Sequence, residues 1–129
     1  EALSPAYRLD LVIGEETAAA APDFALLEID QVQVKGKAIP IRIYTGVGDE
    51  RMAATAEFHR LKDIHDRMLA AYRGQDWAAA ADAAEQCRSS APESLTGFYE
   101  IYAARIAEFR ADPPPADWDG VYVAKSKTG

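Results

Sequence analysis

The chain has 129 residues, is 49% apolar and carries 14 basic against 21 acidic residues, for a net charge of −7. That length allows one domain or two small lobes with a modest core, and the acidic balance argues against a nucleic-acid partner, which would need a basic face. A single cysteine excludes an internal disulfide and a cysteine-rich zinc site, and no apolar run approaches the roughly 20 residues needed to cross a bilayer.

The start of the chain lacks the basic and then apolar regions of a signal peptide, so a cytoplasmic location is expected. Leu9–Ile13 is a short apolar run typical of a strand. Glu15–Ala21 then predicts a short helix, which Pro22 stops. The two glutamates at its start are interpreted as stabilising the helix through its dipole, rather than as groups for acid–base chemistry.

A β-hairpin is predicted next. Residues 25–34 and 38–45 form two apolar-rich strand patterns joined by Lys35-Gly36-Lys37. The glycine allows a positive φ in the tight turn, and the lysines there offer two ammonium groups that suit a polyphosphate. The same pattern also describes an ordinary hairpin with a solvated tip. Pro40 cannot donate to a ladder and is expected at a strand start or on an edge.

After Gly46 the pattern becomes helical, with apolar residues at three- and four-residue steps. The predicted helices are Glu50–Arg73, Trp77–Ser89 and Leu95–Arg110. Gly74 is a candidate C-cap for the first helix, and Asp76 and Ser94 are candidate N-caps for the other two. Cys87 falls in an alanine-rich stretch of the second helix and is interpreted as a small buried hydrophobe.

The segment after the third helix is too apolar to remain unpacked in solvent. Pro113-Pro-Pro115 ends the helix, and we expect Trp118 and Val121 to pack back onto the helices. The last five residues are expected to fray. His59 and His65 lie about 120° apart around the predicted first helix, so they do not form a metal pair and are interpreted as surface residues.

The helical half is similar to one tetratricopeptide unit, because small residues fall where two antiparallel helices would touch and a proline follows. The matching positions are Tyr72, Gly74, Asp76, Trp77, Ala81 and Pro92. Only one unit is visible, so the sequence indicates a helical hairpin extended by a third helix rather than an array.

The first 45 residues resemble the C-terminal end of a class III adenylate/guanylate cyclase catalytic domain. The resemblance is carried by Leu11-Val-Ile-Gly-Glu-Glu-Thr17 and by Leu27-Glu-Ile-Asp-Gln-Val-Gln-Val-Lys-Gly-Lys-Ala-Ile-Pro-Ile-Arg-Ile-Tyr44. Bacterial cyclases of this kind often carry a tetratricopeptide-like extension that closes with a proline run and a Trp-Asp-Gly-Val sequence. Pro113-Pro-Pro-Ala-Asp-Trp-Asp-Gly-Val121 is similar to that ending.

The resemblance implies one active-site contribution from this chain. In the family, the first lysine of the Val-Lys-Gly-Lys turn contacts the nucleotide polyphosphate, which maps onto Lys35. Lys37 is less favoured and is interpreted as a surface residue. Asp30 matches a Leu-Asp position of the family, and we expect a structural role for it, paired with a backbone amide or a base.

Other elements of the cyclase site are not found in this chain. The family binds two metal ions, Mg or Mn, through aspartates on earlier strands, and a later helix supplies an asparagine and an arginine. None of these can be placed here, so no catalytic residue and no cofactor is assigned to the chain. We therefore expect this chain alone to lack cyclase activity.

The combined prediction is an α+β chain. Residues 1–46 would form the strand–helix–hairpin end of a cyclase-type α/β sandwich, and residues 47–129 a three-helix tetratricopeptide-like extension. The implied function is the C-terminal portion of a class III adenylate cyclase that acts on ATP, forms a homodimer and makes no membrane contact through this segment. An upstream region could still anchor the parent protein in a membrane.

An alternative of another class stays open, in which the helical half is a non-catalytic interaction or dimerisation module. Apolar positions on residues 52–109 that stay exposed in the folded monomer would favour it, whereas a Lys35 turn that points into a cleft rather than into bulk water would favour the cyclase. The strands also have open edges. They could fold back on the helices, pair with another copy, or belong to a longer protein.

Overall fold

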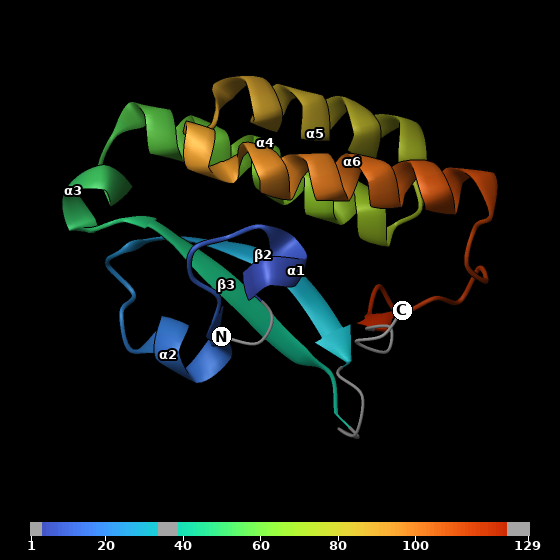
Figure 1. The fold of residues 1–129 in the computed structure, drawn as a ribbon, viewed down its shortest axis with the longest axis horizontal. Coiled ribbons are helices and arrows are strands. Elements are labelled where there is room, and N and C mark those ends of the chain that lie inside the picture. Colours follow the sequence, from blue (N-terminus) through green and yellow to red (C-terminus); the bar gives the residue numbers. More distant parts are fainter. Residues whose placement is uncertain (1–3, 34–38, 124–129) are drawn as a thin grey trace.

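The computed structural model describes residues 4–33 and 39–123. It has a mixed α+β architecture, in which three long helices form a layer over a four-stranded sheet (Figure 1). This confirms the expected fold class of strands followed by three helices. The elements are α1 Ser4–Tyr7, β1 Ile13–Gly14, α2 Glu15–Ala19, β2 Ala25–Gln33, β3 Ile41–Gly48, α3 Glu50–Ala53, α4 Ala56–Arg73, α5 Trp77–Ser90, a 3-10 turn at Glu93–Leu95, α6 Thr96–Ala111 and β4 Tyr122–Val123.

The predicted ribbon is present as β2 and β3, which pair antiparallel from Ala25 opposite Gly48 to Val32 opposite Ile41. Pro40 immediately precedes β3, as expected for a residue without a backbone donor. The sheet order is β1-β3-β2-β4. Both edges are therefore strands of two residues, and such short strands leave little backbone open for pairing with other chains.

A β-bulge interrupts the ribbon in the middle of β2. Glu28 pairs with Tyr44 and Asp30 with Ile43, so Ile29 is the extra residue. Buried residues alternate along β2 before this point, but Ile29 and Asp30 are both buried. The bulge thus shifts the phase of the strand and places a carboxylate in the interior.

The strand predicted over Leu9–Ile13 is mostly wrong, because only Ile13 and Gly14 pair with β3. Leu9 and Val12 are still buried. The chain before Ile13 is held differently, since the Thr45 hydroxyl donates to the Leu11 carbonyl at 2.8 Å. Leu9 and Val12 are therefore buried without belonging to a strand. Apolar content alone could not distinguish a buried strand from a buried segment without strand pairing.

The predicted first helix is two helices. Thr55 interrupts it by accepting a hydrogen bond from the Phe58 amide, which caps the start of α4. Gly74 ends α4 and the Asp76 carboxylate caps α5 through the Ala79 amide, both as predicted. The predicted Ser94 cap is wrong, because Ser94 lies inside the 3-10 turn and α6 begins after it without a side-chain cap.

One hydrophobic cluster joins the two halves of the chain. Leu27, Ile29 and Ile43 of the ribbon belong to it together with Met68 of α4 and Tyr102 of α6. Of the three outcomes open for the strands, the described chain shows that they fold back on the helices.

None of the helices in the described ranges is long and apolar enough to cross a membrane.

The segment after α6 returns to the sheet, as the orange-to-red trace in Figure 1 shows. Val121 is buried, and Trp118 is partly buried against the cluster, which confirms the expected packing. The residues that follow add β4, a short strand parallel to β2 that the sequence did not predict.

Cys87 of α5 is fully buried, as predicted.

Candidate functional site

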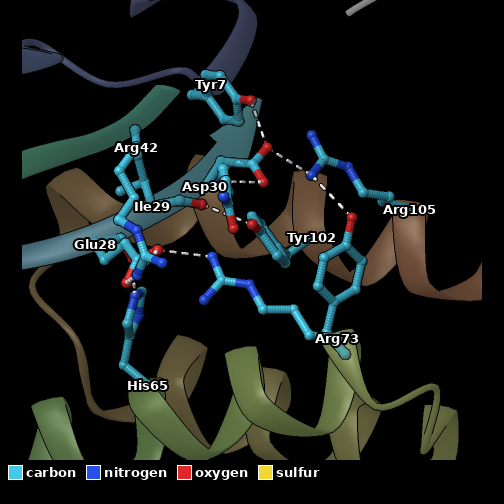
Figure 2. Close-up of polar contacts among 11 residues, drawn as sticks. Tyr7, Glu28, Ile29, Asp30, Arg42, His65, Arg73, Tyr102 and Arg105 are labelled. Carbon is cyan, nitrogen blue, oxygen red and sulfur yellow. Dashed lines mark hydrogen bonds and ion pairs between the residues drawn. The ribbon is translucent and has the colours of Figure 1, made fainter. Parts of the chain in front are cut away.

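The predicted phosphate-binding residues Lys35 and Lys37 lie outside the described residues, between the end of β2 at Gln33 and Ile39. The structure does describe the base of this hairpin. Two groups of polar residues meet β2 there, one around Asp30 and one around Glu28 (Figure 2). These two groups of polar residues fix the position of β2, the strand that precedes residues 34–38.

The first group surrounds the buried carboxylate of Asp30. Arg105 of α6 donates to it at 2.8 Å, the Tyr7 hydroxyl at 2.5 Å and the Gln31 amide at 2.9 Å. The side chains of Asp30 and Arg105 are 0% and 7% exposed, so this is a desolvated ion pair. The expectation that Asp30 is structural and paired with a base and a backbone amide is confirmed.

Aromatic rings enclose this ion pair. The Arg105 guanidinium lies 3.6 Å from the centre of the Tyr122 ring and 4.9 Å from that of Tyr102, and it also donates to the Tyr72 hydroxyl. Burial alone would lower the pKa of Arg105, but Asp30 and the tyrosines raise it above its ordinary value. Burial also raises the pKa of Tyr72, to about 12. These raised pKa values keep the Arg105 guanidinium charged and the Tyr72 phenol neutral.

The second group surrounds Glu28, one position before the bulge. Its carboxylate accepts from Arg73 of α4 at 2.7 Å and from Arg42 of β3 at 3.4 Å. Its backbone carbonyl accepts from Nε2 of His65 at 2.6 Å. Glu28 therefore connects the ribbon to α4 through both its side chain and its main chain.

His65 was predicted to be exposed, and this is wrong: it is fully buried, whereas His59 is exposed as expected. Since the Glu28 carbonyl can only accept, Nε2 carries the proton, and Nδ1 accepts from the Tyr99 hydroxyl at 2.8 Å. Burial lowers the pKa of His65. The ring is thus a neutral connector between β2 and α6.

An open cleft of about 500 Å³ lies between the ribbon, α2 and α4. Its polar lining residues are Glu28, Tyr44, Lys62, Asp66 and Arg73. These charges are mostly satisfied by one another, because Glu28 pairs with Arg73 and Lys62 with Asp66 at 2.8 Å. The cleft therefore offers no free carboxylate pair for acid–base chemistry.

Within residues 4–33 and 39–123, no three acidic, histidine or cysteine side chains are grouped so that they could hold a metal ion. Cys87 is no candidate nucleophile either, because burial raises the pKa of its thiol to about 11. The described part of the chain thus offers neither a metal site of this kind nor an activated thiol.

Sequence reasoning missed Arg105 and His65 as the residues that hold β2. A signal was available for both. Arg105 follows Tyr102 by three residues on the apolar stripe of α6, and His65 lies four residues after Leu61 on that of α4. A polar residue in phase with a buried stripe must find a partner inside the protein.

Comparison of the chain with protein-family models, with curated proteins and with solved structures found no match.

Proposed function

We propose that the chain is the C-terminal part of a class III adenylate cyclase, in which Lys35 contacts the phosphates of ATP. The observation that carries this proposal is an antiparallel ribbon whose two strands are separated in the sequence by Val-Lys-Gly-Lys. One strand ends at Gln33 and the other begins at Ile41, and Lys35 and Lys37 lie between them in the sequence. An ATP-using homodimer in the cytoplasm belongs to the same proposal.

The base of the hairpin supports the proposal physically. A lysine that must meet a polyphosphate needs a rigid support, since a misplaced charge loses most of its effect on a developing negative charge. Asp30 and Glu28 bind β2 to α6 and α4 through charged hydrogen bonds. These contacts restrict β2 five and seven residues before Lys35.

In the proposed reaction the ribose 3′ oxygen attacks the α-phosphorus of ATP, loses its proton, and forms the cyclic phosphodiester. The bond from the α-phosphorus to the bridging oxygen breaks, and pyrophosphate leaves. The Lys35 ammonium offsets negative charge on the departing phosphates. The described residues do not fit the metal ions that such enzymes use, so no step through a metal is assigned to this chain.

The test is made on the complete gene product. We expect it to form cyclic AMP from ATP, and we expect Lys35→Ala to lower kcat/KM by about tenfold or more, because a charged contact to the leaving group is lost. Lys37→Ala is the matched control and should have a smaller effect. The 129-residue chain alone should form no cyclic AMP.

Two results would contradict the proposal. A complete gene product that forms no cyclic nucleotide from ATP or GTP would remove the cyclase assignment. Equal losses in Lys35→Ala and Lys37→Ala would remove the specific role of Lys35 while leaving the cyclase assignment in place.

The alternative of a helical interaction module receives no support from large exposed apolar side chains. Among the described residues, these are Leu11, Phe24, Ile39, Ile41 and Val123, and none of them lies on residues 52–109. The exposed hydrophobic side chains on that stretch are small alanines, such as those at 103, 104 and 107.

A further inference from the structure

A second groove lies where α6 ends and the chain turns back toward the sheet. Its volume is about 490 Å³, and it shares no described lining residue with the cleft beside α4. Side chains from α6, from the proline-containing connection and from β4 line it, among them Glu108, Phe109, Asp112, Trp118, Tyr122 and Val123. It belongs to the helical half and its tail, which the proposed cyclase function leaves without a role.

The walls of this groove are aromatic. Phe109 and Trp118 meet edge to face with ring centres 5.4 Å apart. The Trp118 indole N–H is already used, because it donates to the Val121 carbonyl at 3.1 Å. The Arg105 guanidinium that covers Tyr122 is neutralised by Asp30. Phe109, Trp118 and Tyr122 are each partly exposed, and aromatic rings attract cations that reach their faces.

The rim of the groove is negative. Glu108 and Asp112 are exposed, and neither forms an ion pair with any residue in the described ranges. The C-terminal end of the 16-residue helix α6 lies beside them, and its free carbonyl groups add partial negative charge. No lysine or arginine is among the described lining residues. Carboxylates, helix end and ring faces all favour a positive ligand.

The groove also adjoins an exposed apolar side chain. Val123 lies on the two-residue edge strand β4 and is 65% exposed. An extended peptide can cover such a side chain with an apolar residue while a charged residue beside it enters the groove. A small free cation would leave most of the groove and Val123 uncovered.

We propose that this groove binds an extended peptide from a partner protein, with an arginine or lysine side chain held between the aromatic walls and the two carboxylates. The cation would stack on the exposed rings while its N–H groups donate to Glu108 and Asp112. Apolar residues beside the cation would cover Val123. This proposal does not depend on cyclase activity.

The test measures binding of a fluorescein-labelled peptide, Gly-Leu-Arg-Leu-Gly, to the 129-residue chain by fluorescence anisotropy. Matched peptides replace the arginine by glutamine or glutamate. We expect the arginine peptide to bind about tenfold or more tightly than the glutamine peptide, since it alone supplies the cation. The glutamate peptide should bind weakest.

Protein variants then separate a site from general charge attraction. Glu108→Gln with Asp112→Asn should weaken binding of the arginine peptide by about tenfold. The matched control is Glu57→Gln with Asp82→Asn, which removes the same charge from exposed positions on α4 and α5. That control should bind like the wild type. All four residues are exposed, so loss of folding does not obscure the result.

Three outcomes would overturn the proposal. The first is equal binding of the arginine and glutamine peptides. The second is an equal loss in the control variant, which would mean nonspecific attraction to an acidic protein. The third is binding that appears only after Lys125→Gln with Lys127→Gln, which would make the chain's own basic tail, rather than a partner, the occupant.

Discussion

At the scale of single residues, the buried polar groups are the feature of this protein whose burial costs the most free energy. Asp30 and Arg105 leave water completely, which costs several kcal/mol per ion unless charges and hydrogen bonds are matched. Here the carboxylate accepts from a guanidinium, a phenol and a backbone amide. The pair therefore specifies how α6 meets β2, and it leaves no uncompensated charge while both partners remain.

Arg105→Met is expected to lower the free energy of unfolding by about 3–5 kcal/mol, because Asp30 is left buried with a weaker set of partners. Asp30→Asn combined with Arg105→Met should cost less than the sum of the single changes. Urea denaturation of the four proteins measures this coupling. Arg88→Met, which breaks an exposed pair with Glu85, is the control and should change little. Additive effects of the two buried substitutions would contradict a coupled pair.

His65 should make stability depend on pH. Its pKa is lowered in the folded protein, so below its ordinary value of about 6.5 the unfolded chain binds a proton that the folded chain does not. The free energy of unfolding should therefore fall on acidification, by up to about 1.4 kcal/mol per pH unit.

Urea midpoints between pH 7.5 and 5.5 measure this dependence. His65→Gln should remove it, because glutamine can donate to the Glu28 carbonyl and accept from Tyr99 without titrating. His59→Gln is the control, since His59 is exposed, and it should retain the wild-type dependence. An unchanged pH dependence in His65→Gln would show that another group is responsible.

At the scale of elements, the return of the chain after α6 depends on a backbone conformation that few residues adopt. Gly120 has a φ of +83° and is buried between the tail and α4. A side chain there would meet Arg73, whose guanidinium is bound to Glu28. The Trp-Asp-Gly-Val sequence thus combines an aromatic contact, a carboxylate that accepts from the Val121 amide, and a left-handed turn.

Gly120→Ala is expected to destabilise the protein by about 1–2 kcal/mol, because alanine is strained at positive φ and its Cβ would lie 2.9 Å from Cγ of Arg73. Gly14→Ala is the control, since φ is −81° there and nothing lies within 4 Å of an added Cβ. Thermal unfolding of both variants gives the comparison. Equal melting temperatures would mean that the tail does not depend on this turn.

At the scale of the whole molecule, the strands and the helices share one core. Val32 and Ile43 of the ribbon pack in the same cluster as Phe98 and Tyr102 of α6. Charged hydrogen bonds cross the same boundary. A chain built in this way should unfold as a unit, because neither half keeps its buried surface when the other is lost.

Hydrogen exchange measures this directly. The slowest amides of β2 and those of α4 and α6 should exchange with the same free energy of opening, and Arg105→Met should lower both by the same amount. The exposed residues 88–90 at the end of α5 provide an internal reference that should exchange by local fraying and stay unaffected. Separate opening free energies for ribbon and helices would instead indicate two independently stable units.

Much of the fold could be predicted from local patterns. The ribbon, the short helix at Glu15, the C-terminal end of α4, the start of α5, the packing of Trp118 and the burial of Val121 all followed from periodicity, capping residues and apolar content. Each depends on neighbours a few positions away, so the information lies within a short stretch of chain. The misplaced Ser94 cap and the undivided first helix are errors of the same local kind, where a 3-10 turn and the Thr55 cap prevailed over helical periodicity.

The polar interior could not be predicted in this way. Whether His65 is exposed, and which base meets Asp30, depends on the approach of elements 37 and 75 positions apart in the chain. The bulge at Ile29 and the parallel strand β4 are likewise products of packing, because only contact with the helices makes a buried carboxylate or a two-residue edge strand favourable. Composition and spacing thus settled the kinds of elements and their order, and long-range burial settled which polar groups had to meet.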